Sequence, residues 1–214
     1  MERLLETSLG PARITVSAAD EPRAVLWLGH GAGGGIDSRD LLAVAKALPA
    51  EGITVVRHEQ PWRLAGRKVA VRPPMLDIGW LESAPTVLEL ANGVPLFVGG
   101  RSAGARVGCR TAGALGAAAV VCLGFPLHPP GKPEKSRLEE LLTPDVPVLV
   151  VQGEHDTFGS AAQVRRETEG ETSIRVVEVP KADHGLRVAA RSGVDVNDIV
   201  TSAVRQFVDE VLAG

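Results

Sequence analysis

Short apolar runs alternate along the chain with longer segments in which apolar residues recur at helical spacing. Seven runs have the length of a β-strand and are rich in Val, Leu or Ile, namely residues 11–17, 24–29, 53–58, 95–99, 118–124, 147–153 and 173–179. Most of them are apolar throughout, as is typical of strands that helices cover on both faces. The intervening pattern predicts helices near 38–49, 77–91, 103–115, 160–168 and 197–213. Asn197 or Asp198 is expected to cap the last helix.

This alternation predicts a three-layer α/β/α sandwich around a mainly parallel, twisted sheet of about seven strands. Only "ADEPR" separates the first two runs, which is too short for a parallel crossover, so they are expected to form an antiparallel hairpin at the amino-terminal edge of the sheet. Residues 60–76 and 125–137 are rich in proline and basic residues and are expected to be ordered surface loops. A single domain over residues 1–214 is expected.

Composition narrows the function classes. The 214 residues are 44% hydrophobic and 23% charged with a net charge of −3, and there are only four Phe, three Trp and no Tyr. Nucleic-acid binding is not expected, because there is no basic excess and little aromatic surface. The acidic amino terminus does not resemble a signal peptide and no run is long enough to span a membrane, so a cytoplasmic protein is expected. Cys109 and Cys122 lie in apolar runs and are expected to be buried and reduced.

Polar and glycine-rich segments follow four of the apolar runs. They are "GHGAGGG" (29–35), "GRSAG" (100–104), "GEHDTFG" (153–159) and "KADHGL" (181–186). The carboxyl ends of parallel strands meet at one edge of a sheet, where ligands bind in such folds. The order of Ser102, Asp156 and His184 along the chain is the order of a catalytic triad in an α/β-hydrolase.

Each residue type has a chemical reason to be there. A serine hydroxyl becomes a good nucleophile when an imidazole takes its proton, which assigns Ser102 as nucleophile and His184 as base. The imidazole needs a carboxylate to fix its tautomer; we favour Asp156, with Glu154 as the reserve and Asp183 as a poor third. A structural turn serine at Ser102 and a surface-loop histidine at His184 are the alternatives from the individual motifs.

The tetrahedral intermediate of such a reaction needs two preoriented hydrogen-bond donors for its oxyanion. One is expected to be the backbone N–H of Ala103, which follows the nucleophile. The other is expected from the first glycine loop, where we favour Ala32, with Gly31 next. His30 is expected to brace this loop or to border the substrate.

The glycine loop also permits a different hypothesis. Gly29, Gly31 and Gly34 fit the pattern G-x-G-x-x-G between a strand and a helix, and Glu59 follows the next strand, as in a dinucleotide-binding site. This interpretation leaves Ser102, Asp156 and His184 without a role.

The two expected loops would shape the entrance to the site. Substrate-pocket residues are expected to be Phe125, Leu127, His128 and Lys132 together with His30, and Arg63 and Arg67 would favour an anionic substrate. The prolines of 125–137 favour a fixed wall rather than a mobile lid. The sequence has no metal-ligand spacing and implies no cofactor.

The loops resemble those of the α/β-hydrolase superfamily over essentially the whole chain. The string "GFPLHPPGKPEKSR", followed by "VPVLVVQGEHDTFG", resembles a small cap-less family. This family includes testis-expressed protein 30 and the hydrolase-like domain of subunit 3 of the nonspecific-lethal acetyltransferase complex. The family is also related to the dienelactone hydrolases. This resemblance implies the triad Ser102, Asp156 and His184 and no large cap. It departs from the dienelactone hydrolases, which use a cysteine nucleophile.

Two function classes follow. The first is a serine hydrolase that acts on a small acyl substrate. The second is a non-catalytic interaction module, because some members of the resembled family are subunits of assemblies. A homodimer or a place in a protein complex stays open from the sequence.

Overall fold

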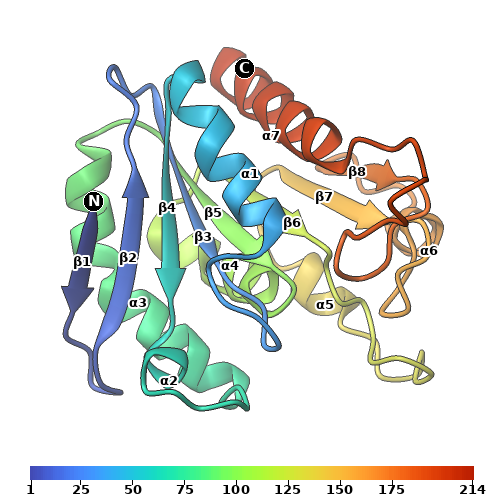
Figure 1. Ribbon diagram of the computed structural model, residues 1–214, viewed down its shortest axis with the longest axis horizontal. Helices are drawn as coiled ribbons and strands as arrows, with labels where there is room; N and C mark the ends of the chain where they lie inside the picture. The colour runs from blue at the N-terminus through green and yellow to red at the C-terminus, as the bar shows by residue number, and fades with distance from the viewer.

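The computed structural model describes residues 1–214 and contains one eight-stranded sheet (Figure 1). The strands are β1 (Glu2–Leu5), β2 (Ala12–Ser17), β3 (Ala24–Gly29), β4 (Ile53–Glu59), β5 (Leu96–Arg101), β6 (Ala119–Leu123), β7 (Val148–Gly153) and β8 (Ile174–Val179). Their order across the sheet is β1-β2-β4-β3-β5-β6-β7-β8. The pairs β1–β2 and β2–β4 are antiparallel, and every other neighbouring pair is parallel. The mainly parallel α/β fold with antiparallel amino-terminal strands is confirmed.

The expected hairpin between residues 11–17 and 24–29 is wrong in its pairing. β2 pairs with β1 and β4, whereas both edges of β3 are taken by β4 and β5. Residues 18–23 carry the chain across β4, a distance of about two strand spacings that six residues span easily. The true edge hairpin uses β1, whose sequence ERLL is short and exposed and has no apolar pattern that marks it as a strand.

Helices cover both faces of the sheet (Figure 1). They are α1 (Arg39–Ala47), the 3₁₀ turn η1 (Leu48–Glu51), α2 (Pro61–Leu64), α3 (Pro73–Ala91), α4 (Ala103–Leu115), α5 (Leu138–Leu141), α6 (Ala161–Glu167) and α7 (Val196–Ala213). α1 and α7 pack on one face over a core of 23 buried apolar residues. α3 and α4 pack on the other over a core of 27, which includes Trp27 and Trp80.

The two expected loops behave differently. Residues 60–76 contain α2 and the first turn of α3, which begins at Pro73; proline fits a first helical turn because the N–H it lacks would have no partner there. Residues 125–137 form neither helix nor strand. Asp195, not Asn197 or Asp198, caps α7, and its carboxylate accepts a hydrogen bond from the Asp198 N–H.

Only the four-residue α5 interrupts the connection from β6 to β7, so the fold carries no large cap over the sheet edge. Cys109 and Cys122 are buried and unoxidised, as expected, with their sulfurs 3.6 Å apart. None of the helices is both long enough and apolar enough to cross a membrane.

Candidate active site

Ser102 occupies a sharp turn between β5 and α4. Its backbone has φ 50° and ψ −106°, a conformation that a non-glycine residue adopts only at a cost of about 1–3 kcal/mol. The Ser102 N–H donates to the carbonyl of Leu123 on the adjacent strand at 3.0 Å, which ties the turn to β6. The strain presents the side chain at the carboxyl edge of the sheet, as in a nucleophile elbow.

Glycine is required around this turn because three chain segments meet there backbone to backbone. A β-carbon at Gly100 (φ 145°) would lie 2.2 Å from the carbonyl oxygen of Gly29, and one at Gly104 would lie 2.3 Å from the same atom. No side chain fits at either position without moving β3. The glycines of the pattern therefore serve close packing between the elbow and the end of β3.

The structure brings Ser102, His184 and Asp156 into one hydrogen-bonded chain. Ser102 Oγ lies 3.0 Å from His184 Nε2, and His184 Nδ1 lies 2.8 Å from Asp156 Oδ2. A buried carboxylate accepts, so Nδ1 carries the ring proton and donates it to Asp156. The lone pair of Nε2 then faces the serine hydroxyl, which is the tautomer a general base needs.

Asp156 is held by further donors at the bottom of the site, and its side chain is fully buried. Its Oδ2 also accepts from Gln152 Nε2 at 2.9 Å, and its Oδ1 accepts from the backbone N–H of Phe158 at 2.7 Å. These bonds fix the direction in which the carboxylate faces the imidazole.

The two alternative acids lie elsewhere. Glu154 accepts from the backbone N–H of Lys181 at 2.7 Å and is exposed. Asp183 pairs with Arg187, with a shortest distance of 2.9 Å to the guanidinium. The structure therefore places Asp156, rather than Glu154 or Asp183, against the His184 ring.

A second Ser–His contact joins β4 and α3. His58 Nε2 lies 3.1 Å from Ser83 Oγ, but the Ser83 hydroxyl donates to the carbonyl of Gly79 at 2.8 Å. His58 Nδ1 has no partner, and burial, with a smaller contribution from nearby His30, lowers the pKa of His58 to about 3. This pair has neither a carboxylate nor contact with solvent, so we interpret it as structural.

The residues expected to supply the two oxyanion donors line one cavity. Ala103 is the first residue of α4, so its N–H has no acceptor within its own helix. Gly31, Ala32 and Ala103 line a cavity of about 10 Å³, together with Trp62, Trp80 and others from the α2–α3 side. That volume is about the size of one water molecule.

His30 braces the glycine loop and does not project into open solvent. Its Nε2 accepts the Gln60 N–H at 3.2 Å, so its Nδ1 carries the proton and donates to the carbonyl of Gly31 at 2.8 Å. Burial lowers the pKa of His30 and keeps the ring neutral. This hydrogen bonding fixes the loop that carries Gly31 and Ala32.

Of the two segments expected to border the substrate, 60–76 lies at this cavity. Trp62, Ala70 and Leu76 line it, and Arg63 lies 4.0 Å from the β-carbon position of Gly35 in the glycine loop. Arg67 lines a separate pocket of about 200 Å³ that shares Trp62 and Gln60 with the small cavity.

The residues named on 125–137 do not line these cavities. Phe125 and Leu127 are buried in the core with Trp27 and Trp80. His128 is buried and its Nδ1 donates to the carbonyl of Pro129, while Lys132 is exposed. The prolines of this segment indicate a restricted backbone. They do not indicate that the side chains of Phe125 and Leu127 point into the core.

Three residues that the sequence analysis did not single out contact the site. Gln152 and Phe158 hold Asp156, as described above. Arg101, immediately before Ser102, donates to the backbone carbonyl of His184 at 2.8 Å. Arg101 stands inside the segment "GRSAG", so its position next to the serine follows from the sequence, whereas its partner does not.

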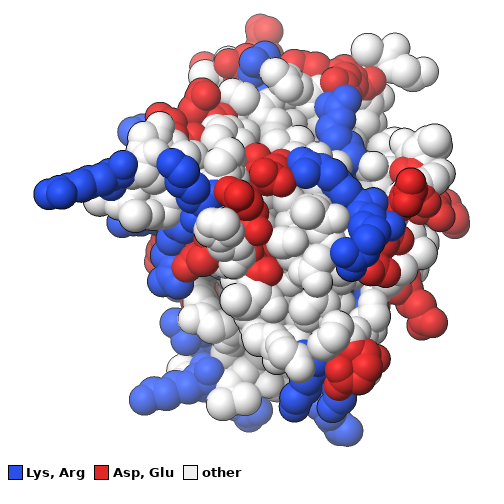
Figure 2. All heavy atoms as spheres, turned by 90° about the vertical axis from the view of Figure 1, so that its right-hand side faces the viewer, with Lys and Arg blue, Asp and Glu red and all other residues white.

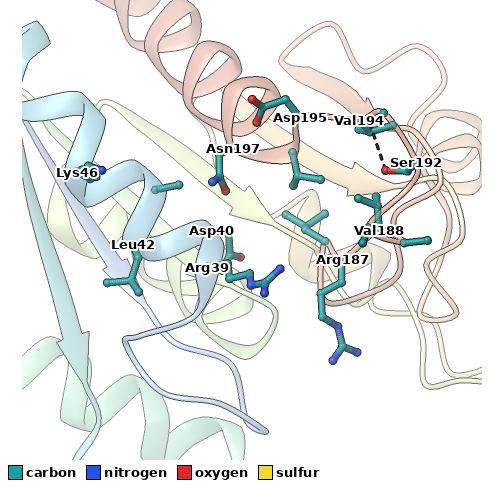
Figure 3. Close-up of a pocket in the computed structure, with 16 residues that line it drawn as sticks. Arg39, Asp40, Leu42, Lys46, Arg187, Val188, Ser192, Val194, Asp195 and Asn197 are labelled. Carbon is teal, nitrogen blue, oxygen red and sulfur yellow. Dashed lines mark hydrogen bonds between the residues drawn. The ribbon is translucent and has the colours of Figure 1, made fainter.

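A groove of about 710 Å³ lies beside the site, between α1 and the segment that precedes α7 (Figure 3). Asp40, Arg187 and Asn197 are among the residues that line it, whereas Ser102, Asp156 and His184 are not.

On the face at the β8 edge, basic and acidic side chains are intermixed, so this face offers no continuous basic surface to a nucleic acid (Figure 2). No three His, Cys, Asp or Glu side chains are grouped to hold a metal ion.

The dinucleotide hypothesis does not fit the glycine loop. Gly29 is the last residue of β3 and is packed against Gly100 and Gly104, so its backbone is not free to approach a pyrophosphate. Glu59 is paired with Arg13 at 2.6 Å at the antiparallel edge of the sheet. We therefore set this hypothesis aside.

Comparison with known proteins agrees with this fold. An α/β serine hydrolase without a lid from Xanthomonas campestris is 22% identical, has a TM-score of 0.74, and the match covers 97% of this chain and 94% of that one. Est1E from Butyrivibrio proteoclasticus is 14% identical with a TM-score of 0.79, covering 100% and 99%. At these identities the likeness establishes a shared fold. A family model described as an alpha/beta hydrolase domain matches residues 22–212, which shows that the chain belongs to the α/β-hydrolase family.

Proposed function

We propose that this protein is a serine hydrolase that cleaves a small carboxylic ester, thioester or related acyl substrate through an acyl-enzyme intermediate. The observation that carries the proposal is the continuous contact from Asp156 through His184 to Ser102, on a strained turn at the carboxyl edge of the sheet. Membership of the α/β-hydrolase family supports it.

In the proposed first half-reaction, Ser102 Oγ attacks the substrate carbonyl carbon while His184 Nε2 takes the hydroxyl proton. The negative oxygen of the tetrahedral intermediate accepts from the N–H of Ala103 and from that of Ala32 or Gly31. Asp156 stabilises the imidazolium. When the intermediate collapses, His184 gives its proton to the leaving alcohol or thiol, and the acyl group stays on Ser102.

In the second half-reaction, water attacks the acyl carbon and His184 takes a proton from it. Collapse of the second tetrahedral intermediate releases the carboxylic acid and returns the proton to Ser102. No cofactor is needed for either step, since every proton moves between His184 and an oxygen or sulfur of the reactants.

The cavity beside the oxyanion donors supports a small acyl group. It has room for about one water-sized group before Trp62 and Trp80 close it. The absence of a large cap leaves the other side of Ser102 open to an alcohol or thiol portion of variable size. The narrower resemblance to the small cap-less family rests on the "PLHPPGKP" string and supplies no substrate.

The test is covalent labelling of Ser102 by a fluorophosphonate, followed by hydrolysis of p-nitrophenyl acetate. We expect one adduct on the peptide that contains Ser102 and the loss of both labelling and turnover in Ser102→Ala. Ser83→Ala is the matched control, because Ser83 also contacts a histidine, and it should keep both activities. Labelling that persists in Ser102→Ala overturns the assignment; a folded wild-type protein that never labels favours the non-catalytic interaction module.

A further inference from the structure

Arg101 joins three parts of the molecule that are distant in the sequence. It lies at the end of β5, its side chain is only 14% exposed, and its guanidinium donates in two directions. Nη1 donates to Asp40 Oδ2 at 3.1 Å, and Nη2 donates to the backbone carbonyl of His184 at 2.8 Å. The nucleophile turn, the first turn of α1 and the histidine loop thus meet at one side chain.

The histidine loop is anchored on either side of His184, where Ala182 O accepts from the His155 N–H at 2.9 Å and the Asp183 N–H donates to Arg187 O at 3.0 Å. Sixteen residues separate the end of β8 from the start of α7, and they contain no helix or strand. Neither the N–H nor the carbonyl of His184 takes part in a backbone–backbone hydrogen bond. Arg101 therefore supplies the one hydrogen bond that the main chain of His184 itself makes, while its ring is held by Asp156 and Ser102.

Asp40 explains why the guanidinium stays in this position. Its side chain is 3% exposed, and Arg101 is the one cation with which it forms an ion pair. A carboxylate buried to this extent is costly to leave unpaired, so it fixes one edge of the guanidinium and directs the other edge at His184. Figure 3 shows Asp40 on α1, facing the segment that follows His184.

We propose that Arg101 and Asp40 are a positioning pair for the hydrolase reaction: they hold the main chain of His184 so that Nε2 stays at 3.0 Å from Ser102 Oγ. This rests on the proposed function. Neither residue touches the reacting atoms. They act by raising the fraction of molecules in which the imidazole is aligned for proton transfer. A displacement of about 1 Å can lower the rate roughly a hundredfold.

Arg101→Lys separates positioning from simple ion pairing. A lysine ammonium can still pair with Asp40, but a single nitrogen has no second edge to present to the His184 carbonyl. We expect Arg101→Lys to lower kcat for p-nitrophenyl acetate by about ten- to a hundredfold with KM changed less than about threefold. Amide hydrogen exchange of residues 182–187 should become faster.

Arg110→Lys is the matched control. Arg110 is also a part-buried arginine held by two carboxylates, Asp77 and Glu140, but it lies on α4 and makes no contact with His184. It should lower the melting temperature at least as much as Arg101→Lys and leave kcat within about twofold. A double variant Arg101→Lys/Asp40→Asn should lose no more kcat than the worse single variant, because the two residues act as a unit.

The two proposals fail separately. If fluorophosphonate labels wild-type Ser102 but labels Arg101→Lys at the same rate, and kcat is unchanged, the positioning pair is refuted and the hydrolase proposal stands. Equal losses of kcat in Arg101→Lys and Arg110→Lys would likewise refute it, since general destabilisation would explain both. A wild-type protein that is never labelled refutes the hydrolase proposal itself.

Discussion

The ring of Phe158 lies against the imidazole of His184, with the ring centroids 4.0 Å apart and the planes inclined by 27°. The backbone N–H of the same residue donates to Asp156 at 2.7 Å. Phe158 therefore contacts His184 through its side chain and Asp156 through its main chain. Side-chain substitution removes the first contact and leaves the second.

Phe158→Ala is expected to lower kcat for p-nitrophenyl acetate by about tenfold, because an aromatic face stabilises an adjacent imidazolium and limits rotation of the ring. Phe158→Leu keeps the bulk without the aromatic face and should fall in between. Steady-state kinetics on the folded variants measures this. An unchanged kcat in Phe158→Ala would show that the stacked ring has no part in the reaction.

Asp156→Asn is expected to reduce kcat/KM by roughly four orders of magnitude, since an amide cannot stabilise the imidazolium and favours the wrong tautomer. Glu154→Gln is the control from the same turn. Its side chain accepts from Lys181 N–H and does not reach His184, so its kcat/KM should stay within about threefold of wild type. The reverse ranking would transfer the role of the acid to Glu154.

Much of this architecture follows from the apolar pattern, because strands buried on both faces, such as β3 and β7, read as continuous runs. The order of the strands does not follow from it: nothing in the sequence of β2 shows that β4 would come between β2 and β3. β1 was missed because an exposed edge strand needs no apolar face.

The candidate site was predictable for a related reason. Ser102, Asp156 and His184 each follow a recognisable strand, so topology brings them together. Arg101 and Phe158 were not assigned, since their roles depend on where a side chain points after folding. The same limit applies to Phe125 and Leu127, which were expected at the substrate and lie in the core.

Trp62 is expected to set the length of the acyl group. It lines both the cavity of about 10 Å³ beside Ala103 and the pocket of about 200 Å³ that contains Met75, and Gln60 is the other residue that the two spaces share. Wild-type protein should prefer acetyl over hexanoyl p-nitrophenyl esters. Trp62→Leu should shift the ratio of their kcat/KM values toward hexanoyl by about tenfold or more.

Met75→Ala is the control for this shift, because Met75 lines only the larger pocket. It should leave the acyl preference unchanged. A Trp62→Leu variant that is folded and keeps the wild-type chain-length profile would show that the acyl group binds elsewhere. Preference of the wild type for chains of ten or more carbons would contradict the small cavity directly.

His58 is expected to make the fold sensitive to acid. Its pKa is lowered from 6.5 to about 3 by burial, with a smaller contribution from His30. Below pH 6.5 the unfolded chain binds a proton at His58 that the folded protein does not. The free energy of unfolding should therefore fall as the pH drops from 6.5 toward 3, by about 1.4 kcal/mol per pH unit from this residue.

Urea unfolding between pH 4 and pH 7 measures this slope. His58→Phe retains a ring against Trp27 and Trp80 and removes the titrating group, so its slope should be smaller by close to one proton. Substitution of the exposed His155 by Gln should leave the slope as in wild type. An identical slope in wild type and His58→Phe would show that His58 does not control acid unfolding.

Because Gly29 packs against Gly100 and Gly104, the reactivity of Ser102 depends on correct folding of the centre of the sheet. The turn that carries Ser102 is packed against the end of β3, and about seventy residues separate the two along the chain. A nascent or partly unfolded chain carries the same serine in a relaxed conformation, without its imidazole partner. Under the proposed function, fluorophosphonate incorporation therefore reports the molecules in which the end of β3 is packed against the turn and His184 has also reached Ser102, so it would follow the completion of refolding.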